Sequence, residues 1–224
     1  MKILGIDTTT KTLCLGLHVD GKFYEYSLQV GRKLSELLTV SIQRVIAAAG
    51  LKIADIDYFV CGLGPGSFTG MRIGLATIKG LSVVKNKPVI GISTLDILAK
   101  NANVKDRLII TALDARRELI YCSSYKYDHG SLKRKSAYSL LSLDELVKKF
   151  PGKAVVLGDA VALYGDALLT RIKNATVLDK DYWSPQAHNL MELAVAKIKA
   201  KQFSSALTIK PIYLYPKECQ IKTR

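Results

Sequence analysis

The order of the predicted secondary-structure elements repeats along the chain, and this repeat constrains the fold more than any other feature. Short apolar runs predict strands, Asp20-Gly21 predicts a hairpin turn, and apolar residues at three- and four-residue spacing predict helices. The first half predicts strands at 2–6, 13–19, 23–30, 56–63 and 88–92, and helices at 34–49, 67–84 and 94–100. The second half predicts strands at 108–114 and 119–125, then a third strand-like stretch that follows a turn at 128–130 and runs through Leu141. It also predicts strands at 153–157 and 176–177, and helices at 143–149, 161–169 and 185–201.

A β-β-β-α-β-α unit that occurs twice indicates an internal duplication. Such duplicated α/β units resemble the actin-like (ASKHA, ribonuclease H-like) fold, in which a phosphoryl ligand sits between the halves. No linker separates the halves, so we expect two packed subdomains, residues 1–103 and 104–224. We expect Ser184 to cap the last helix, with Pro185 in its first turn. The fold alone does not establish an activity.

Positive charge is the most informative part of the composition. The 224 residues include 33 Lys and Arg against 19 Asp and Glu, a net charge of +14. Such a balance favours nucleic acid or phosphate ligands as partners. The basic residues are scattered, with modest concentrations at 133–135, 197–201 and near the C-terminus, so direct contact with RNA stays open.

Other features exclude several classes of protein. A hydrophobic fraction of 49% excludes disorder, collagen and coiled coils. No apolar run is long enough for a membrane span, and the N-terminus lacks the apolar core of a signal peptide, so a cytoplasmic protein is expected. Cys14, Cys61, Cys122 and Cys219 form no CxxC pair and are expected to be buried and reduced. The three histidines form no metal-binding pair, and no Gly-x-Ser-x-Gly elbow is present.

The glycine-rich segment 62–74, GLGPGSFTGMRIG, is the most specific stretch of the chain. Backbone amides between a strand and a helix can face an anion, yet the segment lacks the Gly-Lys-Ser/Thr of a Walker A motif. Alternatively, Gly66, Gly70 and Gly74 recur every fourth residue and give the helix a flat stripe for close backbone approach. We favour the packing interpretation over phosphate binding.

Two strand-ending aspartates are candidates for phosphate chemistry. Asp7, followed by Thr8 and Thr9, has the composition of an ATP-binding hairpin, because a carboxylate can hold water on Mg²⁺ and hydroxyls can bond phosphate oxygens. The same residues also satisfy backbone donors in an ordinary turn, and we slightly favour that interpretation. Asp114 occupies the equivalent turn of the second half, where Arg116 and Glu118 are equally suited to an ion pair or a site.

Several segments together resemble the bacterial TsaB family, also called YeaZ. They are Ile6-Asp7-Thr8-Thr9, the run from Gly64 to Gly74, Ile90-Gly91-Ile92-Ser93-Thr94-Leu95, Leu113-Asp114-Ala115-Arg116 and the final Pro211-Ile212-Tyr213-Leu214. The resemblance covers essentially the whole chain. The glycine-rich segment is specific to the family, with Met71 where Leu or Val is more usual, and the other segments support it.

The resemblance implies a non-catalytic subunit in the synthesis of N6-threonylcarbamoyladenosine at position 37 of tRNA. The implied partners are TsaD, the catalytic paralogue, and TsaE, a small ATPase, with tRNA bound through the complex and a homodimer when the subunit is alone. No cofactor is implied for this subunit, whereas the complex uses ATP and Mg²⁺. The implied partner interface lies on the first two helices, at Leu34, Leu37, Leu38, Ser67, Gly70, Met71, Arg72, Gly74 and Ile78.

Other hypotheses remain open at this point. One is an independent ATPase or kinase that uses Asp7, Thr8 and Thr9 with Asp114 or Asp159, and another is a basic tRNA-binding module. Many relatives have His-Ser at the start of the first helix where this chain has Leu34-Ser35, so no polar contact of that histidine is carried over to this position. For the partner hypothesis, we expect leucine at Gly70 or Gly74 to block binding and leave the monomer folded.

Overall fold

The computed structural model describes residues 1–84 and 86–216, and the chain forms two compact units. The first unit contains Met1–Ile97 and Ser184–Pro211, and the second contains Leu98–Trp183 and the segment from Ile212. The single boundary expected between residues 103 and 104 therefore does not describe the chain, because 184–211 groups with the first unit.

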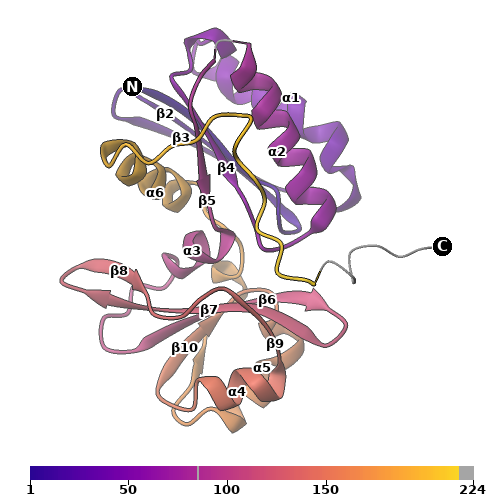
Figure 1. Cartoon of the computed structure of the whole chain (residues 1–224), viewed down its shortest axis with the longest axis vertical. Helices are drawn as coiled ribbons and strands as arrows, with labels where there is room; N and C mark the ends of the chain where they lie inside the picture. Colours follow the sequence, from indigo (N-terminus) through magenta and orange to yellow (C-terminus); the bar gives the residue numbers. More distant parts are fainter. Residues whose placement is uncertain (85, 217–224) are drawn as a thin grey trace. The chain divides into compact units, whose positions relative to one another are not determined.

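The first unit is a five-stranded sheet with helices on both faces (Figure 1). The strand order is β3-β2-β1-β4-β5, with β1, β2 and β3 antiparallel and β4 and β5 parallel to β1. Its strands are β1 (Lys2–Asp7), β2 (Thr12–Val19), β3 (Lys22–Gln29), β4 (Tyr58–Gly62) and β5 (Val89–Ile92). Its helices are α1 (Leu34–Ala48), α2 (Phe68–Val83) and α6 (Ala187–Lys199), with α3 (Thr94–Ala99) after β5 and short 3-10 helices at Gly31–Lys33 and Ile53–Asp55.

Local sequence explains the turns around these elements. Asp20 and Gly21 both have positive φ, at 47° and 89°, as the predicted two-residue hairpin between β2 and β3 requires. Gly50, with φ of 68°, follows α1, where the sequence predicts that the helix ends. At α2, the Ser67 hydroxyl accepts a 3.2 Å hydrogen bond from the Gly70 amide and caps the helix.

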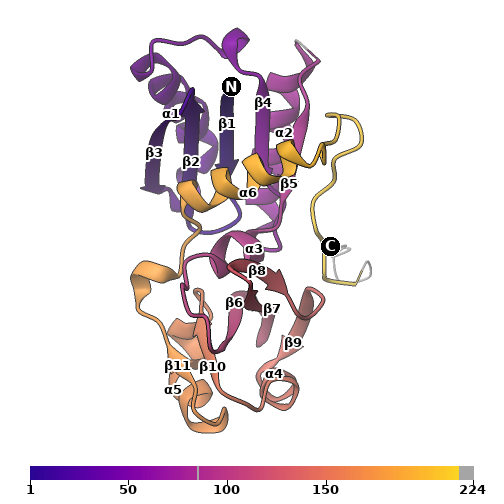
Figure 2. The ribbon, with the colours of Figure 1, turned by 90° about the vertical axis from the view of Figure 1, so that its left-hand side faces the viewer.

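Alternating side chains place two apolar layers on the first sheet. Leu4 and Ile6 of β1 pack on the side of α1 and α2, whereas Ile3 packs on the side of α6. Figure 2 shows α6 crossing the sheet in front of the strands, with α1 and α2 behind them. Gly5 and Gly16 are cross-strand partners, and the space that they leave is filled by the Met191 side chain of α6. This contact explains why 184–211 belongs to the first unit.

The start of α6 differs from the prediction. The helix begins at Ala187 rather than at Pro185, and Ser184 does not cap it. The Ser184 hydroxyl instead lies 3.2 Å from the Thr12 hydroxyl. The Ala187 amide donates a 2.9 Å hydrogen bond to the Glu25 carboxylate of β3, so an acidic side chain from a distant strand satisfies this helix N-terminus.

The second unit repeats the strand order of the first. Its strands run β11-β10-β6-β7-β8, and β9 also pairs with β7. Strands β8 and β9 pair with different parts of β7, so the third strand of this unit is divided in two. The elements are β6 (Leu108–Arg116), β7 (Leu119–Asp128), β8 (Ser131–Arg134), β9 (Ser139–Ser142), α4 (Leu143–Lys149), β10 (Ala154–Leu157), α5 (Val161–Arg171), β11 (Thr176–Val177) and a 3-10 helix at Lys180–Tyr182.

The two sheets confirm the duplicated α/β fold. In each sheet, an antiparallel set of three strands is followed by two parallel strands in the same order. Helices α4 and α5 cover one face of the second sheet, around Ile110, Cys122, Leu146, Val156 and Leu168. This repeated order is that of the actin-like, ribonuclease H-like class predicted from the sequence.

Candidate functional site

The turn between β1 and β2 forms a closed polar cluster inside the first unit. Asp7, Thr8, Thr9 and Thr94 are all buried. One carboxylate oxygen of Asp7 accepts hydrogen bonds of 2.8 Å from both the amide and the hydroxyl of Thr9. The other accepts a 2.7 Å hydrogen bond from the hydroxyl of Thr94, the first residue of α3. The cluster therefore uses both oxygens of the carboxylate that the sequence suggested for Mg²⁺ binding.

Burial controls the acidity of this cluster. Desolvation raises the pKa of Asp7 above its ordinary value, and the hydrogen bonds from Thr9 and Thr94 oppose that rise. Burial, together with the nearby charge of Asp7, also raises the pKa of the Cys14 and Cys61 thiols. Burial raises the pKa of Cys122 to about 12. These three cysteines are free and buried as predicted, whereas Cys219 lies outside the described residues.

The glycine stripe of α2 packs against this same turn. The Ser67 amide donates a 2.7 Å hydrogen bond to the Thr9 carbonyl, and the Thr8 hydroxyl donates a 2.8 Å hydrogen bond to the Gly70 carbonyl. A Cβ atom at Gly66 would overlap the Thr9 carbonyl oxygen, and one at Gly70 would overlap the Thr8 carbonyl oxygen. The expected close backbone approach therefore exists, and the approaching element is the chain's own β1–β2 turn.

The stripe also corrects one expectation about substitutions. A Cβ atom at Gly74 would overlap the Thr8 hydroxyl, and Gly70 and Gly74 are both buried. Leucine at either position would therefore disturb the first unit itself. This contradicts the expectation that such variants leave the monomer undisturbed, whereas their effect on a partner stays a prediction.

The residues predicted for a partner interface divide by exposure. Six of them are buried in the core of the first unit: Leu34, Leu38, Gly70, Met71, Gly74 and Ile78. Leu37 is half-buried, and Ser67 and Arg72 are exposed. Of the predicted residues, only these last three present side chains at the surface, because the others form the inner faces of α1 and α2.

The outer face of α1 and α2 carries, beside the predicted Arg72, residues that the sequence analysis missed. On α2, Phe68, Arg72, Ala76 and Gly80 are exposed and recur every fourth residue, on the side away from the glycine stripe. The Arg72 guanidinium lies 3.8 Å from the centroid of the Phe68 ring. Val40 of α1 and Val83 at the end of α2 are also exposed. The four-residue spacing of Phe68, Arg72 and Ala76 was the available signal for this stripe.

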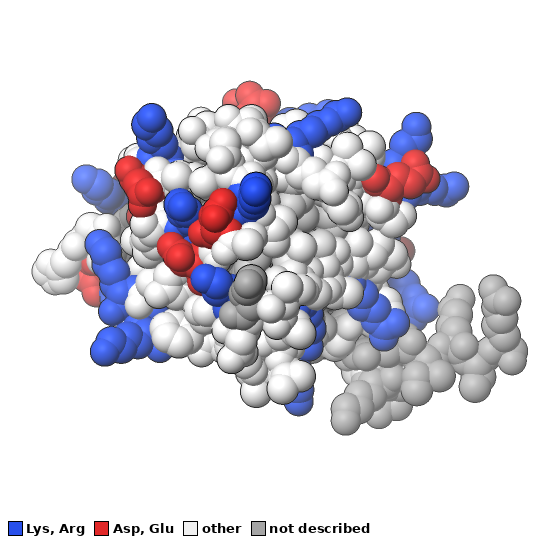
Figure 3. Space-filling view, turned by 90° about the horizontal axis from the view of Figure 1, so that it is seen from above, with Lys and Arg blue, Asp and Glu red and all other residues white. Residues whose placement is uncertain are grey.

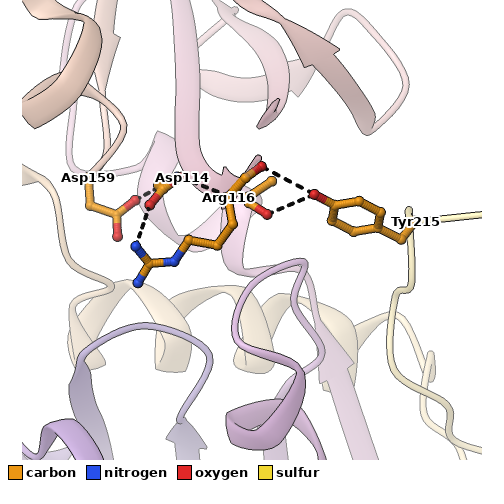
Figure 4. Close-up of polar contacts among 5 residues, drawn as sticks. Asp114, Arg116, Asp159 and Tyr215 are labelled. Atoms are coloured by element: carbon orange, nitrogen blue, oxygen red, sulfur yellow. Dashed lines mark hydrogen bonds and ion pairs between the residues drawn. The ribbon is translucent and has the colours of Figure 1, made fainter. Parts of the chain in front are cut away.

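The turn between β6 and β7 has a different construction, although it occupies the equivalent position in the second unit (Figure 4). The Asp114 carboxylate accepts a 2.8 Å hydrogen bond from the Arg116 amide and lies 3.2 Å from the Arg116 guanidinium. Asp159, in turn, accepts a 2.8 Å hydrogen bond from the Asp114 amide. Arg116 therefore pairs with Asp114, not with Glu118.

The same turn has a strained backbone. Arg116, Arg117 and Glu118 all have positive φ, between 52° and 67°, which is uncommon for residues with side chains. The Tyr215 hydroxyl lies within hydrogen-bonding distance of the carbonyl oxygens of Ala115, at 2.9 Å, and Arg116, at 3.2 Å. Tyr215 comes from a segment about a hundred residues away, so no local sequence pattern indicated this contact.

Two further observations concern residues 1–84 and 86–216. In this part of the chain, no His, Cys, Asp and Glu side chains gather in a group of three or more that is suited to a metal ion. No helix in the same part is long and apolar enough to cross a membrane. Asp7 lies in the first unit and Asp114 in the second, each hydrogen-bonded within its own unit.

Comparison with known proteins identifies the family. A family model described as TsaD, tRNA N6-adenosine threonylcarbamoyltransferase, matches residues 28–207. This match covers more than half of the chain, so the chain belongs to that family of TsaD-like proteins.

Individual relatives show which group within this family the chain is similar to. A tRNA threonylcarbamoyladenosine biosynthesis protein TsaB from Escherichia coli (strain K12) is 26% identical over 220 residues, covering 96% of this chain and 94% of that protein. TsaB from Bacillus subtilis (strain 168) is 33% identical over 135 residues, covering 60% of this chain and 59% of that protein. The structure of YeaZ from Pseudomonas aeruginosa superposes with a TM-score of 0.79 at 23% identity, covering 95% and 99% of the two chains. Within the TsaD-like family, the chain is a TsaB (YeaZ) protein.

Proposed function

We propose that this chain is a non-catalytic subunit that supports threonylcarbamoyl transfer to tRNA adenosine by TsaD. Its match to TsaB proteins over nearly their full length supports a role in this modification. The proposed partners are TsaD and the small ATPase TsaE, with tRNA bound through the assembly in the cytoplasm. ATP and Mg²⁺ are assigned to the assembly, and no cofactor is assigned to this subunit.

The observation that carries the non-catalytic role is the closure of the β1–β2 turn by α2. An ATPase of this fold class would need the Asp7 carboxylate and the neighbouring amides and hydroxyls to face Mg²⁺ and phosphate. Here Asp7 is buried, both of its oxygens accept hydrogen bonds, and the backbone of α2 lies against Thr8 and Thr9. These contacts argue against the alternative of an independent ATPase or kinase based on Asp7 and Asp114.

The outer face of α1 and α2 supplies a surface suited to a protein partner. Helix α2 has no acidic residue, and its exposed stripe combines the aromatic Phe68 and Arg72 with the small residues Ala76 and Gly80. Aromatic residues and arginine are enriched in protein interfaces, and other charged residues are depleted at their centres. Small side chains also allow two helices to approach closely. We assign this face to TsaD, and to a second copy of the chain when TsaD is absent.

Reconstituted modification tests the proposed function. Radiolabelled threonine is supplied with the adenylate-forming enzyme, ATP, TsaE and tRNA, together with this chain alone, TsaD alone, or both. Label should enter tRNA only when both proteins are present. Transfer by this chain alone would overturn the non-catalytic assignment, and transfer by TsaD alone at the full rate would overturn the accessory role.

Two variants that replace an alanine by glutamate test the interface. Ala76→Glu introduces a larger, charged side chain at the centre of the proposed face and should abolish co-elution with TsaD, because it prevents the close approach of the helices and a carboxylate is costly to bury. Ala162→Glu places the same charge on an exposed position of α5 and should leave co-elution unchanged. Retained binding by the Ala76 variant would show that TsaD binds elsewhere.

A further inference from the structure

The β7–β8 hairpin presents three lysines on one exposed face. Strand β8 forms the edge of the second sheet, and Figure 1 shows the hairpin reaching out from that sheet. Lys126 of β7 is the direct cross-strand partner of Lys133 of β8. The Lys135 amide donates a 2.7 Å hydrogen bond to the Ser124 carbonyl, which continues the ladder beyond β8. Side chains two residues apart share a face, so Lys126, Lys133 and Lys135 point to the same side.

The hairpin gives these positive charges little compensation. All three lysines are exposed, and among the described residues none of them forms an ion pair. The acidic side chain at the tip of the same face, Asp128, lies 3.7 Å from His129. Like charges directly opposite each other destabilise a strand pair. An anion bound across the lysines would remove this repulsion.

Protection of a sheet edge does not explain the whole arrangement. Lysines on edge strands discourage pairing with other chains, and that role accounts for Lys133. Lys126 lies on β7 just beyond Tyr125, the last residue that pairs with β6, so at this position β7 is paired with β8. Edge protection does not require two lysines directly opposite each other, because like charges in that arrangement oppose the pairing of the strands, so the opposed pair requires another explanation.

The neighbouring residues favour RNA over an acidic protein surface. On the opposite face of the hairpin from the lysines, the Arg134 guanidinium of β8 lies 4.1 Å from the centroid of the Tyr138 ring, and Tyr127 is half-buried. A guanidinium stacked on an aromatic ring offers a planar surface for an unpaired base. Lysines are compact point charges that contact phosphates without reading sequence.

We propose that the β7–β8 hairpin binds the phosphate backbone of RNA through Lys126, Lys133 and Lys135. The choice of tRNA as that RNA rests on the proposed function. The hairpin supplies electrostatic attraction and orientation, while recognition of the modified adenosine belongs to the catalytic partner. Figure 3 shows basic side chains on several parts of one face of the molecule, so the test needs a control for net charge.

Binding of unmodified tRNA to the full-length chain, alone and with TsaD, tests the proposal. The triple variant Lys126→Gln, Lys133→Gln, Lys135→Gln is compared with the control Lys148→Gln, Lys173→Gln, Lys180→Gln, whose lysines are also exposed in the second unit. Both variants lose three positive charges, so any effect of net charge is matched. Affinity is measured by fluorescence anisotropy over a range of salt concentrations.

The hairpin variant should bind tRNA roughly tenfold or more weakly at low salt, and its log–log salt slope should be shallower by about 2, because three phosphate contacts no longer release counterions. The control should bind like the wild type. Equal losses in both variants, or no loss in the hairpin variant, would overturn the proposal. Displacement of the tRNA by poly-glutamate at equal charge concentration would also overturn it, in favour of an acidic protein partner.

Transfer of threonine label separates this inference from the proposed function. If the wild type and the control variant support TsaD but the hairpin variant binds tRNA normally, the proposed function stands and the hairpin assignment fails. If the wild type does not support TsaD, the proposed function fails, and the binding curves still decide whether the hairpin contacts RNA.

Discussion

The amide of Ser67 donates a 2.7 Å hydrogen bond to the carbonyl oxygen of Thr9, and this bond joins the start of α2 to the β1–β2 turn. The turn carries the aspartate and threonines that would hold phosphates in an ATPase of this fold class. The helix carries the glycines that let its backbone reach them. The most specific segment of the sequence therefore closes a potential nucleotide site within one unit.

Three glycines of α2 should differ in their tolerance of alanine. Gly70→Ala should cost about 1–3 kcal/mol in the free energy of unfolding, because its Cβ atom overlaps a backbone oxygen of Thr8. Gly74→Ala should cost less, since the overlapping Thr8 hydroxyl can rotate away at the loss of its hydrogen bond to Gly70. Urea denaturation of each variant measures these differences.

Gly80→Ala is the matched control in the same helix. A Cβ atom at Gly80 meets nothing within 4 Å, so alanine should stabilise the protein by about 0.5–1 kcal/mol through its better helix propensity. Equal effects at Gly70 and Gly80 would show that α2 does not pack on the β1–β2 turn as described.

Asp7 is expected to be replaceable by asparagine but not by alanine. The Thr9 and Thr94 hydroxyl oxygens lie 2.7 Å apart, although both hydroxyls also lie within 2.8 Å of the Asp7 carboxylate. The three oxygen pairs, Thr9–Asp7, Thr9–Thr94 and Thr94–Asp7, need one hydrogen each, and the two hydroxyls supply only two. The third hydrogen comes from a proton on the Asp7 carboxyl, or from the side-chain amide when residue 7 is asparagine. Asp7→Ala leaves the buried Thr9 amide without its acceptor and should cost about 1–3 kcal/mol.

The pH dependence of the Asp7→Asn variant follows from the raised pKa of Asp7. The folded state holds the proton more tightly than the unfolded state, so wild-type stability falls as the pH rises from about the ordinary value of 3.8 through the raised value. Asparagine removes this loss, so the stability difference between variant and wild type should grow in favour of the variant over that window. Denaturation at several pH values measures the difference, and a difference independent of pH would contradict the assignment.

The sequence predicted most of the fold because its elements have strong local signals. The apolar spacing of α1, the end of that helix before Gly50 and the Asp20-Gly21 turn each depend on residues close together in the chain. The contact of Gly5 and Gly16 with Met191 depends on residues far apart, which is why the grouping of α6 with the first unit was not predicted. Distance in sequence also hid the capping of α6 by Glu25.

The candidate site was predicted only in part, because its residues come from segments that are far apart in the chain. Asp7, Thr8, Thr9 and the glycine stripe were all singled out, but the sequence did not show that they contact each other. A helical stripe of glycines indicates that something packs closely, without saying whether it is the same chain or a partner. The outer stripe at Phe68, Arg72 and Ala76 also has a four-residue spacing in the sequence, but the spacing alone does not tell which face of α2 is exposed.

The contact between Glu25 and α6 predicts a graded effect of substitution. Glu25→Ala leaves the Ala187 amide at the helix N-terminus without its protein acceptor and should lower the free energy of unfolding by about 0.5–2 kcal/mol. Glu25→Gln keeps an acceptor oxygen but loses the charge, so it should fall between Ala and the wild type. Thermal denaturation at low and high salt tests this order, and the Gln variant should approach the wild type as salt increases.

The strained turn after β6 predicts opposite effects at two residues. Arg117 has φ of 52° and an exposed side chain, so Arg117→Gly should relieve backbone strain and raise the free energy of unfolding by up to about 1 kcal/mol. Tyr215→Phe removes the hydroxyl that holds the carbonyl oxygens of Ala115 and Arg116, and should lower the free energy of unfolding by about 0.5–1.5 kcal/mol. If Tyr215 acts by holding the strained conformation, its loss should matter less in the Arg117→Gly background, and a double-mutant cycle measures that coupling. Strictly additive effects would show that the tyrosine and the strained backbone are energetically independent.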